Sequence, residues 1–201
     1  MAKTPDTRER LLQTAADLIG TSSYHATGVD SICEAAGIHK GSFYHHFESK
    51  EELAMAALED QWLRIKPRID EIFSPASKPL DRLRDYARLT LEMQREKQRQ
   101  TGCVCGCALY ALGSEMGTLA PALLQKIQGL LEIKLRYLVS AVREAHAAGE
   151  IRAPEPERVA QLLVDLVEGM LMRARIQNDL APLEGLEAAM FQVLGLQPAL
   201  R

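Results

Sequence analysis

The sequence predicts an all-α fold of about nine helices, three short ones at the N-terminus followed by longer ones. Apolar residues recur at helical spacing along most of the chain, and no segment alternates as a half-buried strand would. Capping residues or prolines precede these segments, and glycines follow several of them. With 201 residues, of which 47% are hydrophobic, the chain is long and apolar enough to bury a core.

The first helix is expected over about 5–19, with Thr4 or Asp6 as its cap. Gly20 ends it, because glycine readily adopts the conformation that closes a helix. Its apolar side chains share one face, which we expect to lie against the core: Leu11, Leu12, Ala15, Leu18 and Ile19.

The second helix starts with a capping pattern, in which Thr27 and Asp30 satisfy amides of the first turn. Gly37 follows it, where a tight turn can use a positive φ. One continuous face is apolar and should be buried, and it consists of Val29, Ile32, Cys33 and Ala36.

A third, short helix is expected over about 39–46. Phe43 and Phe47 lie one turn apart and should pack this helix onto the first two. Its opposite side carries the ammonium of Lys40, the phenol of Tyr44 and the imidazole of His45. Gly41, on the same side, has no side chain and leaves its backbone accessible. Three short helices with a glycine-containing turn form a helix-turn-helix, and these groups suit phosphates and base edges. The spacing alone is equally compatible with a solvated face.

Ser49 and Glu52 form a second capping box, which opens a fourth helix reaching at least Lys66. Pro67 is expected to kink or end that helix, and 74–79 is typical of a linker.

We place the domain boundary within the fourth helix. Residues 1–53 then form a helix-turn-helix domain, and residues 54–201 form a second helical domain. The later helices are expected at about 79–98, 103–115, 119–148, 155–178 and 182–195.

The segment from Thr27 to Leu53 reads TGVDSICEAAGIHKGSFYHHFESKEEL. It strongly resembles the DNA-binding region of the TetR/AcrR family of bacterial regulators, and the resemblance extends back over 7–19. It covers about a quarter of the chain, and the remainder agrees only in length and helical layout.

The resemblance implies a homodimer that binds a palindromic operator in double-stranded DNA, usually as a repressor, and is released by a small-molecule effector in the second domain. By matching position, the residues implied to contact DNA are Thr27, His39, Lys40, Gly41, Ser42, Tyr44, His45 and Lys50. His39 occupies a place where the family often has serine or another small polar residue. The operator preference therefore does not carry over.

Cys103, Cys105 and Cys107 form a cluster, whereas Cys33 lies on the buried face of the second helix. If a helix begins at Cys103, its dipole favours the thiolate there, and Cys103 becomes the best candidate for a redox or electrophile switch. The thiols can equally be small core residues. A metal site is disfavoured, because three sulfurs at i, i+2 and i+4 on a helix do not converge on one ion.

An effector pocket should lie between helices of the second domain, and its candidate residues besides the three clustered cysteines are Met93, Tyr110, Tyr137 and Met170. Broad apolar faces on the last two helices suggest a two-fold symmetric four-helix interface between subunits. The residues expected there are Val159, Leu163, Leu166, Met170, Leu186 and Met190. The alternative is that this face is buried within one subunit.

Other classes of protein find little support. The chain shows no nucleophile elbow, phosphate loop or metal-ligand motif, so we expect neither an enzyme nor a cofactor or metal site. No apolar run approaches the ~18–20 residues that span a bilayer, and the polar N-terminus lacks a secretion signal, so a cytoplasmic location is expected. The net charge is −3, so the overall charge of the chain gives no indication of nucleic-acid binding. A helical adaptor that binds protein instead of DNA remains the alternative.

Overall fold

A computed structural model describes residues 6–116 and 120–196. Within these residues the chain forms helices and no strand, in agreement with the predicted fold class. The helices are α1 (Thr7–Thr21), α2 (Val29–Ala36), α3 (Lys40–His46), α4 (Lys50–Ile72), α5 (Pro79–Thr101), α6 (Ala108–Met116), α7 (Pro121–Ala147), α8 (Pro156–Gln177), α9 (Ala181–Glu184) and α10 (Leu186–Val193).

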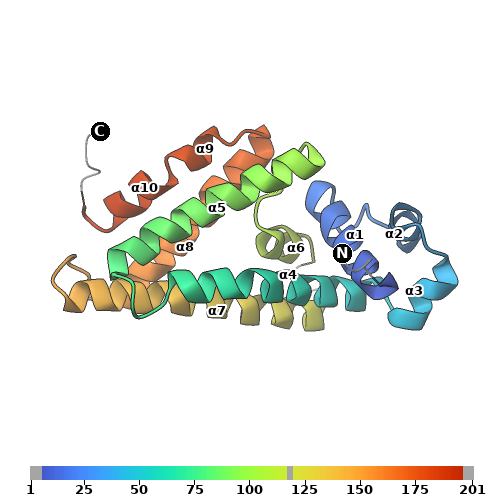
Figure 1. The fold of residues 1–201 in the computed structure, drawn as a ribbon, viewed down its shortest axis with the longest axis horizontal. Helices are drawn as coiled ribbons and strands as arrows, with labels where there is room; N and C mark the ends of the chain where they lie inside the picture. Colours follow the sequence, from blue (N-terminus) through green and yellow to red (C-terminus); the bar gives the residue numbers. More distant parts are fainter. Residues whose placement is uncertain (1–5, 117–119, 197–201) are drawn as a thin grey trace, which may run out of the picture. The chain divides into compact units, whose positions relative to one another are not determined.

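The chain divides into two compact units, and the division falls inside α4 and again inside α7. Unit 1 comprises residues 1–65 and 108–130, and unit 2 comprises the remainder. In unit 1, α1 packs against α2, α3 and α6 (Figure 1). Its core includes four fully buried side chains: Leu11, Ile32, Phe43 and Leu53.

In unit 2, α8 packs against α9 and α10, and α10 also runs beside α5 (Figure 1). Fully buried leucines of α5, α7 and α8 contribute to its core, among them Leu83, Leu138 and Leu163. The unit therefore has its own apolar core.

The N-terminal helices largely follow the sequence. Asp6 caps α1 by accepting a hydrogen bond from the Glu9 amide at 2.8 Å, whereas Thr4, the other candidate, lies outside the described residues. Gly37 takes φ 64° as expected. Thr27 does not cap α2: the N-cap is Gly28, and the Thr27 hydroxyl donates to the carbonyl of Ser23 instead.

Pro67 does not end α4, because the helix continues to Ile72, and a kink at Pro67 stays a prediction. Two later expectations were wrong. The last expected helix is broken at Gly185 into α9 and α10. The helix expected from residue 103 begins only at Ala108, since Gly102 and Gly106 take positive φ values of 76° and 69°.

Candidate nucleic-acid interface

The short helix α3 has two distinct sides. Phe43 and Phe47 are 0% and 2% exposed, with ring centroids 6.1 Å apart, so they anchor the helix to the core of unit 1. Tyr44, by contrast, is 53% exposed. The other exposed residues on this side are His39, Lys40, Gly41 and His45, with Ser42 half-buried. The predicted division between an anchoring and an outward face is therefore confirmed.

Gly41 lies on the outward side of α3, and packing within the protein does not require a glycine there. A Cβ placed there would meet no heavy atom within 4 Å. The missing side chain instead leaves backbone exposed, which permits close approach of another surface. A groove floor in DNA is such a surface.

Lys40 forms an ion pair with Asp30, whose carboxylate oxygen lies 2.7 Å from Nζ. The hydrogen bond and the charge of Asp30 raise the pKa of Lys40. Both side chains are exposed, and exposed pairs contribute little to stability. Lys40 can therefore exchange the carboxylate for a phosphate at little cost.

Thr27 and Lys50 are positioned differently from the residues of α3. Thr27 is only 3% exposed, and its hydroxyl donates to the Ser23 carbonyl at 2.7 Å. The Lys50 ammonium donates to the carbonyls of Tyr24 and Thr27 at 2.8 and 3.0 Å, and it lies 4.0 Å from the centroid of the Tyr24 ring. Burial lowers the pKa of Lys50. Both residues thus shape the loop before α2.

Two further residues hold this region, and sequence reasoning missed both. The Arg10 guanidinium donates to the carbonyls of Ala36 and Gly37, and so fastens the turn between α2 and α3 to α1. Glu115, from α6, accepts a hydrogen bond from the backbone N–H of His25 at 3.2 Å. Local sequence carries no signal for contacts between residues so far apart.

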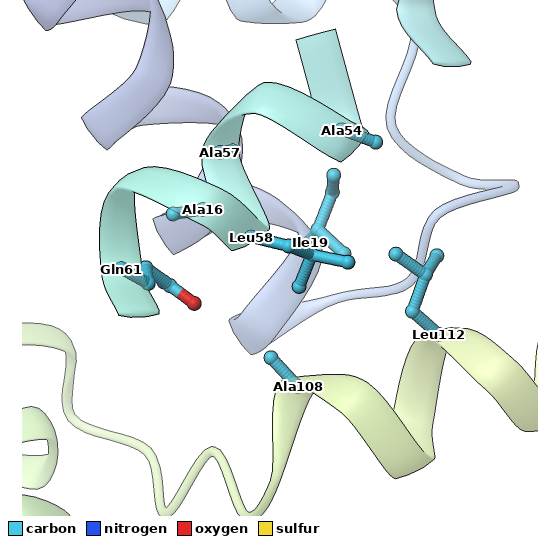
Figure 2. A pocket seen from close by; sticks show the side chains of 8 residues that line it. All are labelled: Ala16, Ile19, Ala54, Ala57, Leu58, Gln61, Ala108 and Leu112. Atoms are coloured by element: carbon cyan, nitrogen blue, oxygen red, sulfur yellow. The ribbon is translucent and has the colours of Figure 1, made fainter. Parts of the chain in front are cut away.

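A small apolar crevice lies where α1, α4 and α6 meet (Figure 2). It offers about 10 Å³, which is roughly the space that one water molecule needs. It is therefore a packing defect and too small for an effector. Its lining consists of Ala16, Ile19, Ala54, Ala57, Leu58, Gln61, Ala108 and Leu112.

The three clustered cysteines lie in the loop before α6, and none is the first residue of a helix. Cys105 is buried, with its Sγ 3.9 Å from the Thr101 hydroxyl, while Cys103 and Cys107 are half-buried. The side chains of Asn178 and Gln94 hold the loop through the amides of Val104 and Gly106, at 2.8 and 2.9 Å. All four cysteines of the chain are described, and none forms a disulfide. The helix-dipole argument for Cys103 therefore does not apply.

The other candidate effector residues are spread over several elements. Met93 is exposed on α5, and Met170 is half-buried on α8. The Tyr137 hydroxyl, on α7, donates to Asp70. Tyr110 belongs to unit 1, whereas the other three belong to unit 2.

The apolar faces of α8 and α10 are partly internal and partly exposed. Leu163, Leu186 and Met190 are at most 1% exposed and fill the core of the protomer itself. Val159, Leu166 and Met170 are half-buried. Four large apolar side chains of these two helices are exposed, namely Leu162 at 49%, Met172 at 38%, Ile176 at 77% and Val193 at 38%.

Two other kinds of site are absent from the described residues. No group of three or more His, Cys, Asp or Glu side chains is arranged to hold a metal ion. No helix in the same part of the chain combines the length and apolar character that crossing a bilayer requires.

Two family models match the chain. One, described as bacterial regulatory proteins of the tetR family, matches residues 11–57. The other, a tetracyclin repressor-like C-terminal domain, matches residues 79–190. The helix-turn-helix lies within the first match, and α5 to α9 lie within the second.

Curated relatives and solved structures are also similar. The transcriptional regulator AcuR of Cereibacter sphaeroides is 32% identical over 171 residues, covering 84% of this chain and 76% of AcuR. The HTH-type transcriptional repressor NemR of Escherichia coli is 29% identical over 185 residues, 89% of each chain. A crystal structure of a regulatory protein TetR from Rhodobacter sphaeroides has a TM-score of 0.80 at 30% identity, covering 92% of this chain and 96% of the other. The crystal structure of the reduced form of E. coli NemR has a TM-score of 0.79 at 26% identity, and the match covers 97% of this chain and 100% of the NemR chain.

Proposed function

Because the chain belongs to the tetR family of bacterial regulatory proteins and is a DNA-binding transcriptional regulator, we propose that it binds a palindromic operator as a homodimer and represses transcription there. The observation that carries this proposal is the orientation of α3, with Phe43 and Phe47 buried and its polar side exposed. Repression is favoured by the similarity to NemR, which is a repressor.

In the proposed complex, α3 enters the major groove. Lys40 exchanges Asp30 for a phosphate, and Tyr44 and His45 present hydrogen-bonding groups to phosphates or base edges. His39, Gly41 and Ser42 complete this surface. Thr27 and Lys50 contribute by fixing the loop that places the α2 N-terminus, whose amides can receive a phosphate.

The second subunit is proposed to pack on the exposed apolar residues of α8 and α10. Leu162 and Ile176 supply the most exposed apolar surface, and the half-buried Val159, Leu166 and Met170 extend it. An isologous interface has two-fold symmetry, which matches the symmetry of a palindrome. It would set the two α3 helices ~34–36 Å apart, or one further DNA turn.

We further propose release by an effector, either a small molecule or a thiol-reactive compound, that acts in the C-terminal domain. The half-buried Cys103 and Cys107 are the accessible thiols of the cluster, and the similar NemR has been crystallised in a reduced form. The effector needs only to prefer the state that does not bind DNA. A preference of ~1.4 kcal/mol shifts that equilibrium tenfold.

The test is selection of bound duplexes from random DNA, followed by titration of the selected operator. A double variant, Lys40→Ala with Tyr44→Ala, should lose operator binding by more than tenfold while remaining dimeric in sedimentation. Arg152→Ala, which removes an exposed cation from the other unit, is the matched control and should leave affinity unchanged. Unchanged operator binding by the double variant would contradict the proposed reading face.

A further inference from the structure

A buried ion pair lies in the core of unit 2, between α7 and α8. The Lys134 ammonium donates to Oε1 of Glu168, and the two side chains are 18% and 4% exposed. Tyr86 reaches the same point from α5, is 6% exposed, and shares a hydrogen bond with Lys134. Cys107, at the end of the loop that follows α5, lies close enough to this cluster that a negative charge on its sulfur raises the pKa of both Lys134 and Tyr86.

The protonation of this cluster at neutral pH follows from its surroundings. Burial alone would lower the pKa of Lys134, but Tyr86, Cys107 and Glu168 together outweigh burial and hold that pKa well above its ordinary value. Burial raises the pKa of Tyr86. Lys134 is therefore a cation and Tyr86 a neutral phenol, and the charges of Lys134 and Glu168 cancel.

Glu168 has one oxygen that the fold leaves unsatisfied. Oε2 is buried and has no hydrogen-bond partner among the described residues. A fold does not need a buried ion pair for stability, since apolar residues of similar size often replace one without loss. An unpaired carboxylate oxygen beside such a pair adds a further cost. A ligand that donates a hydrogen bond to Oε2 would remove this cost.

The hydrogen-bonding groups of Glu168 and Tyr86 define the chemistry of a ligand that would pair with them. Glu168 Oε2 requires a hydrogen-bond donor, and Tyr86 can donate its hydroxyl hydrogen because Lys134 donates to its oxygen. A hydroxyl or a carboxamide both donates and accepts. Charged ligands are disfavoured, because the pair is already neutral and buried net charge is costly.

Aromatic side chains lie next to the cluster. The Phe73 ring is 5.8 Å from that of Tyr86 and 5.2 Å from that of Tyr137, measured between centroids. We propose that Glu168, Lys134 and Tyr86 form the polar recognition point of the effector site, and that the effector is a neutral apolar molecule carrying a hydroxyl or carboxamide group. The regulatory consequence of this site rests on the proposed function, whereas the binding itself does not.

The binding test uses the full chain without DNA and a series of matched probes in titration calorimetry. Benzyl alcohol and benzamide carry the required group, whereas toluene, benzoate and benzylammonium lack it or add a charge. The first two should bind at least tenfold more tightly than the other three. Equal binding of toluene, tighter binding of either ion, or no binding of any probe would overturn the proposal.

Variants assign the binding to the cluster. Glu168→Gln preserves size but replaces the unpaired carboxylate by an amide, and should weaken benzyl alcohol binding at least tenfold. Glu168→Leu with Lys134→Met removes both charges together, so the core stays neutral, and this variant should prefer toluene. The matched control is Glu59→Gln with Lys126→Met, which removes an ion pair of 2.9 Å in unit 1 and should change nothing. An unchanged probe preference in the Leu/Met variant, with its unfolding transition intact, would contradict the assignment.

Operator titration with and without benzyl alcohol separates this proposal from the proposed function. Probe binding in the predicted order with unchanged operator affinity would support the recognition site and contradict effector release. Operator binding that no probe disturbs, together with no probe binding in calorimetry, would overturn the site while leaving DNA binding as proposed.

Discussion

At Gly41, on the outward side of α3, stability and DNA binding make opposite demands. Alanine favours a helix by up to about 1 kcal/mol relative to glycine, and a methyl group there meets no atom of the protein within 4 Å. Gly41→Ala should therefore leave the free energy of unfolding unchanged or raised. In the proposed complex the methyl group would meet the groove, so operator affinity should fall about tenfold, which corresponds to about 1.4 kcal/mol.

Urea unfolding and operator titration check the two halves of this prediction. Gly129, in α7, is the matched control, because it too is an exposed helical glycine whose added Cβ would touch nothing within 4 Å. Gly129→Ala should show the same effect on unfolding without loss of operator affinity. If both variants bound the operator like the parent, close approach at Gly41 would be refuted.

Gly37 differs from Gly41, because there the backbone itself requires glycine. Its φ of 64° costs an L-residue roughly 1–2 kcal/mol, and an added Cβ would lie 3.2 Å from the Arg10 guanidinium. Gly37→Ala should therefore destabilise the protein by more than Gly149→Ala does, since Gly149 has φ 73° with open space around it. Thermal unfolding of the two variants tests this prediction. An equal loss of stability in both would show that the Arg10 side chain moves aside at no cost.

At the scale of the elements, local pattern predicted α3 well and the segment before α6 badly. The two phenylalanines one turn apart fix the buried side of α3, and nothing distant is needed to infer it. The loop before α6 depends on Gln94 and on Asn178, which lies 74 residues from Val104. Periodicity cannot reveal such contacts, so the cysteines were expected on a helix that they do not enter.

Glu115 shows the same limit and makes a prediction about how α6 supports the DNA-binding region. Its carboxylate accepts from the His25 amide, and its charge raises the pKa of Lys50, in opposition to the larger effect of burial. Glu115→Ala should destabilise the protein by about 0.5–1.5 kcal/mol, and operator affinity should fall because the loop before α2 loses this support.

Glu115→Gln keeps an acceptor oxygen and should retain most of the affinity that the alanine variant loses. Glu132→Ala, which removes an exposed carboxylate from α7, serves as the control and should be neutral. Operator titration and urea unfolding are the measurements. An alanine variant indistinguishable from the parent in both would remove Glu115 from any role in positioning the loop.

At the scale of the whole molecule, the sequence predicts which helices form the subunit interface, which stays a prediction, but not which of their residues face outward. Apolar residues that recur at helical spacing give α8 a face too broad for one neighbour, and periodicity alone does not divide that face. Burial of Leu163, Leu186 and Met190 within the protomer assigns them to its own core. Leu162 and Ile176 remain exposed, and the proposed homodimer depends on them.

Two glutamates at these positions should therefore dissociate the dimer without unfolding the subunit. Leu162→Glu with Ile176→Glu places charges on exposed sites, so the subunit's free energy of unfolding should change little, whereas burying both charges in an interface is costly. Leu63→Glu is the matched control, because Leu63 is 59% exposed on α4.

Sedimentation should show monomers only for the double variant. Operator affinity should fall with it, because a monomer contacts one half-site. A double variant that stayed dimeric would place the interface elsewhere, and a monomer that kept full operator affinity would contradict binding as a dimer.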